Sequence, residues 1–152
     1  MRKLCGLIVV LTSIFALSGL ALASPPEPKT FVAVLSGECP QADEDWRGVA
    51  VLHLNDDGSI DYKVVINNVD EPIIAGHVHF LPPGEPRGPI VEDLKTTGPA
   101  EHQGVIATGT FTNPTLVAGL LAGAEYYVNL HTATCLLPLG AVRGPLEAAP
   151  PG

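Results

Sequence analysis

The chain has 152 residues, with 16 acidic residues against 8 lysines and arginines and a formal net charge of −8. This length accommodates one domain with a hydrophobic core of its own. The negative charge argues against a nucleic-acid-binding protein, because such proteins need basic residues to neutralise phosphates. The 15 prolines and 16 glycines divide the chain into short segments, which favours strands and turns and excludes a bundle of long helices.

The N-terminus has the layout of a secretory signal peptide. Two basic residues precede an apolar run over residues 4–22, and the run ends in Ala21-Leu22-Ala23, a small-residue cleavage pattern. We therefore expect cleavage after Ala23, which removes residues 1–23 and leaves a secreted or periplasmic protein without membrane insertion. The alternative is an uncleaved membrane anchor, since about 20 apolar residues can span a bilayer.

Export changes the interpretation of the three cysteines. Cys5 would leave with the signal peptide, so Cys39 and Cys135 remain as an even pair in an oxidising compartment. We expect a disulfide between them that joins the start of the domain to its end. The alternatives are two unrelated thiols, or Cys135 as a metal ligand four residues after His131.

The body of the chain consists of short segments that are typical of strands. Within residues 60–66, apolar residues alternate with polar ones, as expected for a half-buried antiparallel strand that follows a hairpin loop over residues 55–59. One short helix is expected over Thr115–Ala122, after Asn113 and Pro114. The expected strands, in chain order, are Thr30–Leu35, Gly48–Leu54, Ile60–Ile66, Ile73–Leu81, Ile90–Leu94, Gly104–Thr112, Glu125–Thr132 and Leu139–Leu146.

About eight short strands at this spacing predict an all-β fold, either an antiparallel β-sandwich or a flattened Greek-key barrel. The strands place a single domain at residues 30–147. Residues 24–29 and 148–152 are proline-rich tails with little to bury.

Five segments along the chain resemble, in order, the landmarks of the CHRD domain. This module is repeated in chordin and occurs singly in many bacterial secreted proteins. The resemblance covers residues 30–147 and implies an extracellular binding or interaction module whose protein partner is unknown. The segments are Phe31–Pro40 (FVAVLSGECP), Gly76–Phe80 (GHVHF), Gly88–Val91 (GPIV), Tyr127–Thr132 (YVNLHT) and Pro138–Gly144 (PLGAVRG).

Three histidines form a candidate metal site. His77 and His79 alternate with aliphatic residues in one expected strand, and His131 does so in another, so all three project outward if the aliphatic residues line the core. Two imidazoles at i and i+2 with a third from a neighbouring strand can bind Cu²⁺ or Zn²⁺, and we expect their ring nitrogens within about 5 Å of one another. The second ring nitrogen of a metal-binding histidine needs a hydrogen-bond acceptor, and Asn129 or a backbone carbonyl is a candidate for it. The alternative is a set of exposed or hydrogen-bonded histidines that stabilise loops.

Other polar residues carry weaker expectations. We expect Arg143 to pair with a buried carboxylate or with carbonyl groups, and Arg87 to be solvated. The acidic run Asp43–Asp45 is typical of a solvated loop. His53 ends a strand and is expected near an edge, and His102 lies in a loop.

Two classes of function follow from these residues. The first is a non-enzymatic binding module with a surface three-histidine metal site. The second is a copper-dependent redox protein resembling copper–zinc superoxide dismutase, which also carries a His-x-His pair on a strand. Its zinc site is missing here, because His102 is the only histidine between the two histidine-bearing strands.

The signal peptide gives a first testable prediction. Exported protein should begin at Ser24, because the small residues at Ala21 and Ala23 fit the cleavage pocket. Intact-mass measurement of secreted material checks this. A mass that still includes Met1 would favour the membrane anchor.

Overall fold

The computed structural model describes residues 29–96 and 103–150. The expected signal peptide, nearly all of the proline-rich tail, and His102 lie outside the described residues.

Eight strands and one helix make up the described part of the chain, so the expected all-β fold is confirmed. The strands are short, as the many prolines and glycines predict. The elements are β1 (Thr30–Gly37), β2 (Arg47–Leu54), β3 (Ile60–Asn67), β4 (Ala75–Phe80), β5 (Ile90–Asp93), β6 (Gly104–Phe111), α1 (Pro114–Leu121), β7 (Tyr126–His131) and β8 (Val142–Ala148).

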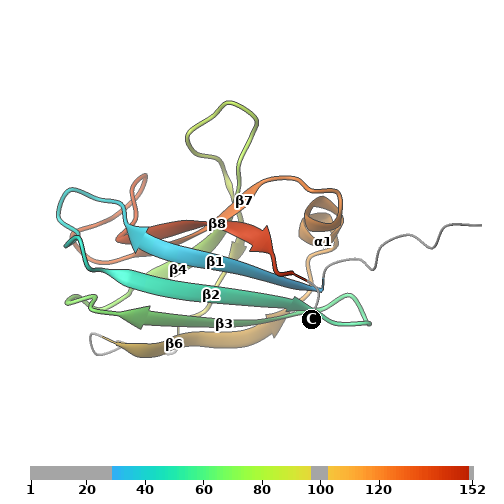
Figure 1. Cartoon of the computed structure of the whole chain (residues 1–152), viewed down its shortest axis with the longest axis horizontal. Coiled ribbons are helices and arrows are strands. Elements are labelled where there is room, and N and C mark those ends of the chain that lie inside the picture. Colours follow the sequence, from blue (N-terminus) through green and yellow to red (C-terminus); the bar gives the residue numbers. More distant parts are fainter. Residues whose placement is uncertain (1–28, 97–102, 151–152) are drawn as a thin grey trace, which may run out of the picture.

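All eight strands belong to one antiparallel sheet, in the order β5-β4-β7-β8-β1-β2-β3-β6. The sheet curls into a half-barrel with α1 at one end (Figure 1). Thr96, which follows the edge strand β5, forms a bridge to Ala107 in β6 at the opposite edge. The two edges of the sheet therefore approach each other, and the core lies on the enclosed face.

Local sequence explains the tight connections. Gly58 has a φ of +83° in the hairpin between β2 and β3, a conformation that a residue with a Cβ adopts rarely. The Asn113 side chain accepts a hydrogen bond from the Leu116 amide, and Pro114 occupies the first turn of α1. Gly123 follows the helix with a φ of +74°. The expected helix is thus confirmed, one residue earlier at its start.

The alternating pattern along the strands decides which side chains fill the core. In β3, Ile60, Tyr62, Val64 and Ile66 all point into the enclosed face and are buried. Ile74 has the same parity as the buried Val78 within the expected strand Ile73–Leu81, which predicts that it faces the core, but it is exposed. It lies just before β4, whose alternation begins only at Ala75.

A disulfide joins Cys39, in the loop after β1, to Cys135, in the loop after β7. Backbone hydrogen bonds accompany it, because the Cys39 amide donates to the Gly140 carbonyl and the Glu38 amide to the Ala141 carbonyl. Both cysteines are buried. The disulfide therefore holds the two loops together at one end of the half-barrel.

Removing this disulfide should destabilise the domain. The bond closes a loop of 96 positions. In the chain-entropy model, its loss from a Cys39→Ala/Cys135→Ala variant lowers the free energy of unfolding by about 4 kcal/mol. Denaturant unfolding of the mature protein measures the change, with the single Cys39→Ala variant as a control expected to lose a similar amount. A loss below about 1 kcal/mol would contradict the expectation.

Candidate metal centre

Strand parity places three histidines on the outer face of the sheet. In β4 and β7, Val78, Val128 and Leu130 are fully buried on the enclosed face. The alternate positions therefore face the other way. The two strands are adjacent, with His79 opposite Tyr127, His77 opposite Asn129, and Ala75 opposite His131.

The three imidazoles form one cluster, as expected. One ring nitrogen from each of His77, His79 and His131 lies within 4.8 Å of the other two. The ring centroids of His77 and His131 are 5.0 Å apart, and those of His77 and His79 are 5.7 Å apart. This spacing fits one small ion that binds all three rings.

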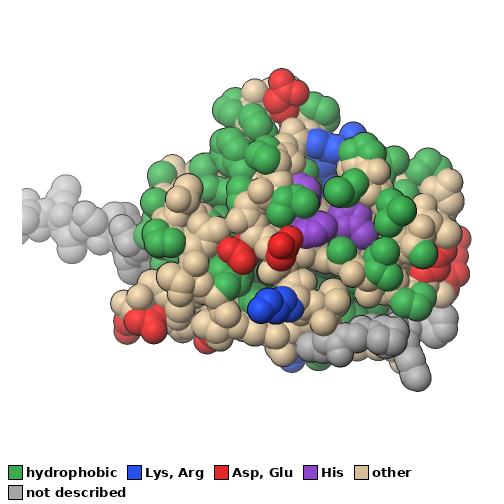
Figure 2. All heavy atoms as spheres, turned by 180° about the vertical axis from the view of Figure 1, so that it is seen from behind, with side chains coloured by type: hydrophobic (Ala, Val, Ile, Leu, Met, Phe, Trp, Pro, Cys, Tyr) green, Lys and Arg blue, Asp and Glu red, His purple; other side chains and the backbone are tan. Residues whose placement is uncertain are grey.

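The expectation of a surface cluster needs a correction. His79 is 4% exposed and His131 is 2% exposed, while the His77 side chain is 13% exposed. Figure 2 shows histidine side chains gathered in one place on the molecular surface, with hydrophobic side chains around them. The alternation of side chains along the strands correctly predicts the side of the sheet on which the histidines lie. However, the loops after β4 and β7 cover that side and leave mainly His77 in contact with solvent.

In each of the three rings, one or both nitrogens have no hydrogen-bond partner. The Nδ1 of His79 is 2.9 Å from the Gly88 carbonyl oxygen, so it donates, and its Nε2 is buried without a partner. The Nε2 of His77 is 3.5 Å from an Asp93 carboxylate oxygen, and its Nδ1 is buried without a partner. Neither nitrogen of His131 has one. Buried polar atoms are nearly always satisfied, so this concentration of unpaired nitrogens marks the cluster as a candidate site for a ligand that could pair with them.

Burial lowers the pKa of all three histidines below the ordinary value of 6.5. The neighbouring imidazoles add to the shift for His77 and His79. The Gly88 carbonyl opposes it at His79, and backbone groups of Cys135 and Leu139 oppose it at His131. Those contacts of His131 do not reach the geometry of a hydrogen bond. The neutral form that results is the one that binds metal ions.

A second layer of residues supports the cluster from the side of β8. The ring of Tyr127 is stacked on His79, with centroids 4.6 Å apart and planes at 10°. The Arg143 guanidinium lies 3.7 Å from the centroid of the same tyrosine ring. The Tyr127 hydroxyl accepts a hydrogen bond from the Gly88 amide. Tyr127 thus links His79 to the loop above it and to β8.

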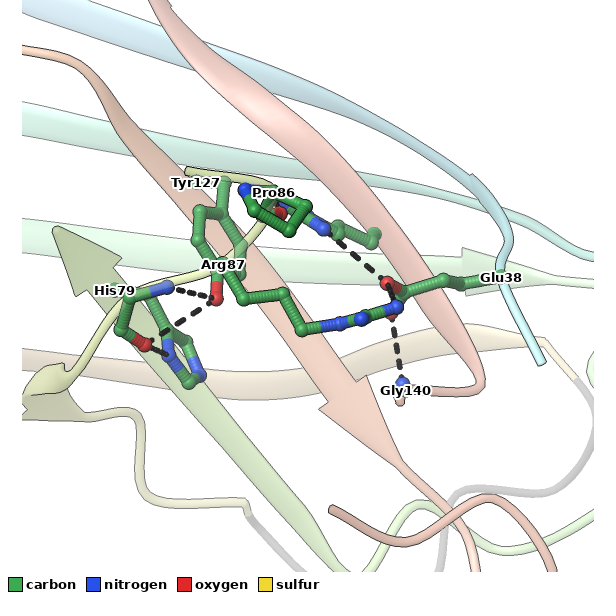
Figure 3. Close-up of polar contacts among 8 residues, drawn as sticks. Glu38, His79, Pro86, Arg87, Tyr127 and Gly140 are labelled. Atoms are coloured by element: carbon green, nitrogen blue, oxygen red, sulfur yellow. Dashed lines mark hydrogen bonds and ion pairs between the residues drawn. The ribbon is translucent and has the colours of Figure 1, made fainter. Parts of the chain in front are cut away.

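Glu38 holds this second layer in place (Figure 3). One of its carboxylate oxygens accepts hydrogen bonds from Arg87 and Arg143, each at 3.2 Å. The other accepts one from the Gly140 amide at 2.8 Å. Arg143 also donates to the Pro86 carbonyl. Arg143 therefore contacts both a carboxylate and a carbonyl group.

Sequence reasoning missed Glu38 and Tyr127 as members of the site. The available signal was position, since Glu38 precedes Cys39 and Tyr127 shares the parity of His131. Arg87 was expected to be solvated, but it pairs with Glu38 because the loop that carries it folds over the sheet.

The structure also places His53, the acidic run Asp43–Asp45 and Asn129. His53 is not at an edge, because β2 pairs with both β1 and β3, and it contacts the Thr30 hydroxyl. The acidic run Asp43–Asp45 is solvated as expected, since all three residues are exposed. Asn129 is buried opposite His77, and its Oδ1 has no hydrogen-bond partner.

These observations define an all-β domain with a buried three-histidine cluster on the outer face of a curled sheet. The family model of the CHRD domain matches residues 31–146. The chain therefore belongs to the CHRD domain family. No curated protein and no solved structure matches the chain. Among the described residues, no helix has the length and apolar character needed to cross a membrane.

The histidine cluster should make the stability of the metal-free protein depend on pH. Each folded-state pKa is below the unfolded value of 6.5, so the unfolded chain binds more protons as the pH falls. The contribution is fully present above pH 6.5 and is lost as the pH falls below it. Denaturant midpoints at about pH 7.5 and about pH 5.5 should show this loss.

A variant with His77, His79 and His131 all replaced by glutamine serves as the comparison and should show a smaller loss. A variant with His53→Gln, an exposed position, is the matched control and should behave as the wild type does. An equal loss in the triple variant would show that other groups cause the pH dependence.

Proposed function

We propose that the domain is an extracellular binding module that holds one transition-metal ion, Cu or Zn, through His77, His79 and His131. The observation that carries this proposal is the set of buried ring nitrogens without hydrogen-bond partners, in rings that offer nitrogens within 4.8 Å of one another. A metal ion would satisfy them. Imidazole nitrogen is a common ligand for both metals.

The groups behind two of the rings support the same proposal. Metal-binding histidines usually donate their second ring nitrogen to a carbonyl or carboxylate oxygen, which fixes the ring and its tautomer. His79 donates to the Gly88 carbonyl, and His77 has Asp93 at 3.5 Å from its Nε2. In both rings, the nitrogen left over is the unpaired one.

Secretion is part of the proposal. The buried Cys39–Cys135 disulfide fits an oxidising compartment, and CHRD domains are of an extracellular type. The apolar N-terminal run with its cleavage pattern at Ala23 would supply the export signal. With an acidic net charge, the mature domain would suit a soluble extracellular partner rather than an anionic membrane.

Metal titration of the purified protein tests the proposal. One equivalent of Zn²⁺ or Cu²⁺ should bind, and His77→Ala and His131→Ala should each weaken binding by about tenfold or more, because each variant removes a ligand. Calorimetry against a competing chelator measures the affinities. The His53→Ala variant is the control, since that histidine is exposed on β2, away from the cluster.

Unchanged affinity in both His77→Ala and His131→Ala would mean that the cluster is structural and would overturn the proposal. A superoxide dismutation assay on copper-loaded protein separates the binding role from the redox alternative. Activity that disappears with His131→Ala would favour the redox protein over the non-enzymatic module.

A further inference from the structure

The three-histidine cluster offers a metal ion only neutral ligands. Three neutral imidazoles supply no negative charge. Both cysteines of the described residues form a disulfide, so they supply no thiolate. In the part of the chain that the structure describes, no carboxylate belongs to the cluster. A bound ion would therefore keep its full charge.

The nearest carboxylates compensate that charge poorly. Asp93 approaches His77, but its side chain is 79% exposed, so water screens it. Glu38 is better buried, but it is shared by Arg87 and Arg143. Two cations against one anion leave this group with a net positive charge. It contacts the cluster through the Tyr127 ring, which has Arg143 on one side and His79 stacked against it.

Burial adds to this effect. His79 and His131 are almost completely buried, so solvent reaches the cluster mainly at His77. The cost of moving an ion out of water rises with the square of its charge, and a nearby positive group adds repulsion in proportion to that charge. Moving a monovalent ion from water into the three-histidine cluster therefore costs much less free energy than moving a divalent ion.

The number of ligands points the same way. Zn²⁺ at a site with three protein ligands takes a water or substrate as its fourth, and Cu²⁺ prefers square-planar or tetragonal surroundings. Cu⁺ has a filled d shell and accepts three nitrogen ligands without a fourth. The cluster offers one nitrogen from each of three rings, and two of these rings are almost completely buried. The number of ligands therefore suits Cu⁺ better than either divalent ion.

We propose that the three-histidine cluster selects copper as Cu(I), in preference to Cu(II) and Zn(II), because it supplies three neutral ligands beside a positively charged arginine pair. This inference rests on the proposed metal-binding function and names the ion and oxidation state that the site favours. The class of ligand that the inference assigns to the cluster is a soft monovalent metal ion.

Competition titrations on the mature wild-type protein test the preference. Cu(I) is maintained anaerobically with ascorbate and measured against a chromogenic Cu(I) chelator, and Cu(II) and Zn(II) are measured against chelators of their own. Cu(I) should bind at least a hundredfold more tightly than either divalent ion. A hundredfold ratio of Cu(I) to Cu(II) affinity raises the reduction potential of the bound copper by about 120 mV above that of the aqueous Cu(II)/Cu(I) couple, at 59 mV for each tenfold step.

Equal or tighter binding of Cu(II) or Zn(II) overturns the inference. The His131→Ala variant distinguishes the two proposals. If it weakens divalent binding while the wild type prefers a divalent ion, the metal site stands and only the Cu(I) preference fails. If the binding of no ion is weakened by either His77→Ala or His131→Ala, the proposed function fails as well.

A charge variant tests the physical cause. Asn129→Asp keeps the size of the side chain and adds a negative charge opposite His77. The ratio of Cu(I) to Cu(II) affinity should fall by at least tenfold. Asn67→Asp is the matched control, because Asn67 is exposed in β3, four strands from β7 in the sheet order, and its ratio should not change. An unchanged ratio in Asn129→Asp overturns the electrostatic explanation, and the wild-type titrations decide the preference itself.

Discussion

The arrangement above the histidines depends on the Glu38 carboxylate. Its two oxygens bind three groups that are far apart in the sequence: Arg87 in the loop after β4, Arg143 in β8, and the Gly140 amide in the loop after β7. The adjacent disulfide fixes Glu38 at the end of β1. The ion pairs of Glu38 are partly buried, and such pairs are weak evidence for stability but can specify one geometry. Here they hold two loops over the outer face of the sheet, and this covering converts a row of surface histidines into a nearly buried cluster.

The sequence predicted the parts of the molecule that depend on local patterns. A period of two placed His77, His79 and His131 on one face, because successive side chains of a strand alternate. It could not predict that this face is covered, since covering depends on contacts such as the pair of Glu38 and Arg143, which are 105 positions apart. The sequence pattern also could not predict where the strands begin and end. Ile74 is apolar and next to β4, but it precedes the first residue of the alternation.

Glycines allow the outer face to carry both the site and its cover. A Cβ on Gly140 would lie 1.5 Å from the Asn129 side-chain oxygen, so only glycine lets this loop approach β7 so closely. A Cβ on Gly88 would lie 1.8 Å from the Phe80 carbonyl oxygen. Gly88 is also the residue whose carbonyl accepts the His79 hydrogen bond. Gly88 and Gly140 therefore let the two covering loops pack directly against the strands that hold the histidines.

The thickness of one sheet separates the cluster from the core. Val78, Val128 and Leu130 point into the half-barrel, and the histidines that alternate with them point away from it. The core can therefore keep its packing when a histidine side chain on the outer face is shortened.

The backbone of β4 and β7 is fixed by that packing and by the pairing of His77 with Asn129. A rigid backbone holds the three rings in place, which would lower the free-energy cost of binding the proposed ion. The loops, by contrast, are held over the rings by Glu38, so a change at Glu38 can alter the burial of the rings and the charge around them while the sheet keeps its pairing. The sheet thus gives the site a stable frame that includes Arg143, and the loops supply Glu38 and Arg87 to its charged surroundings.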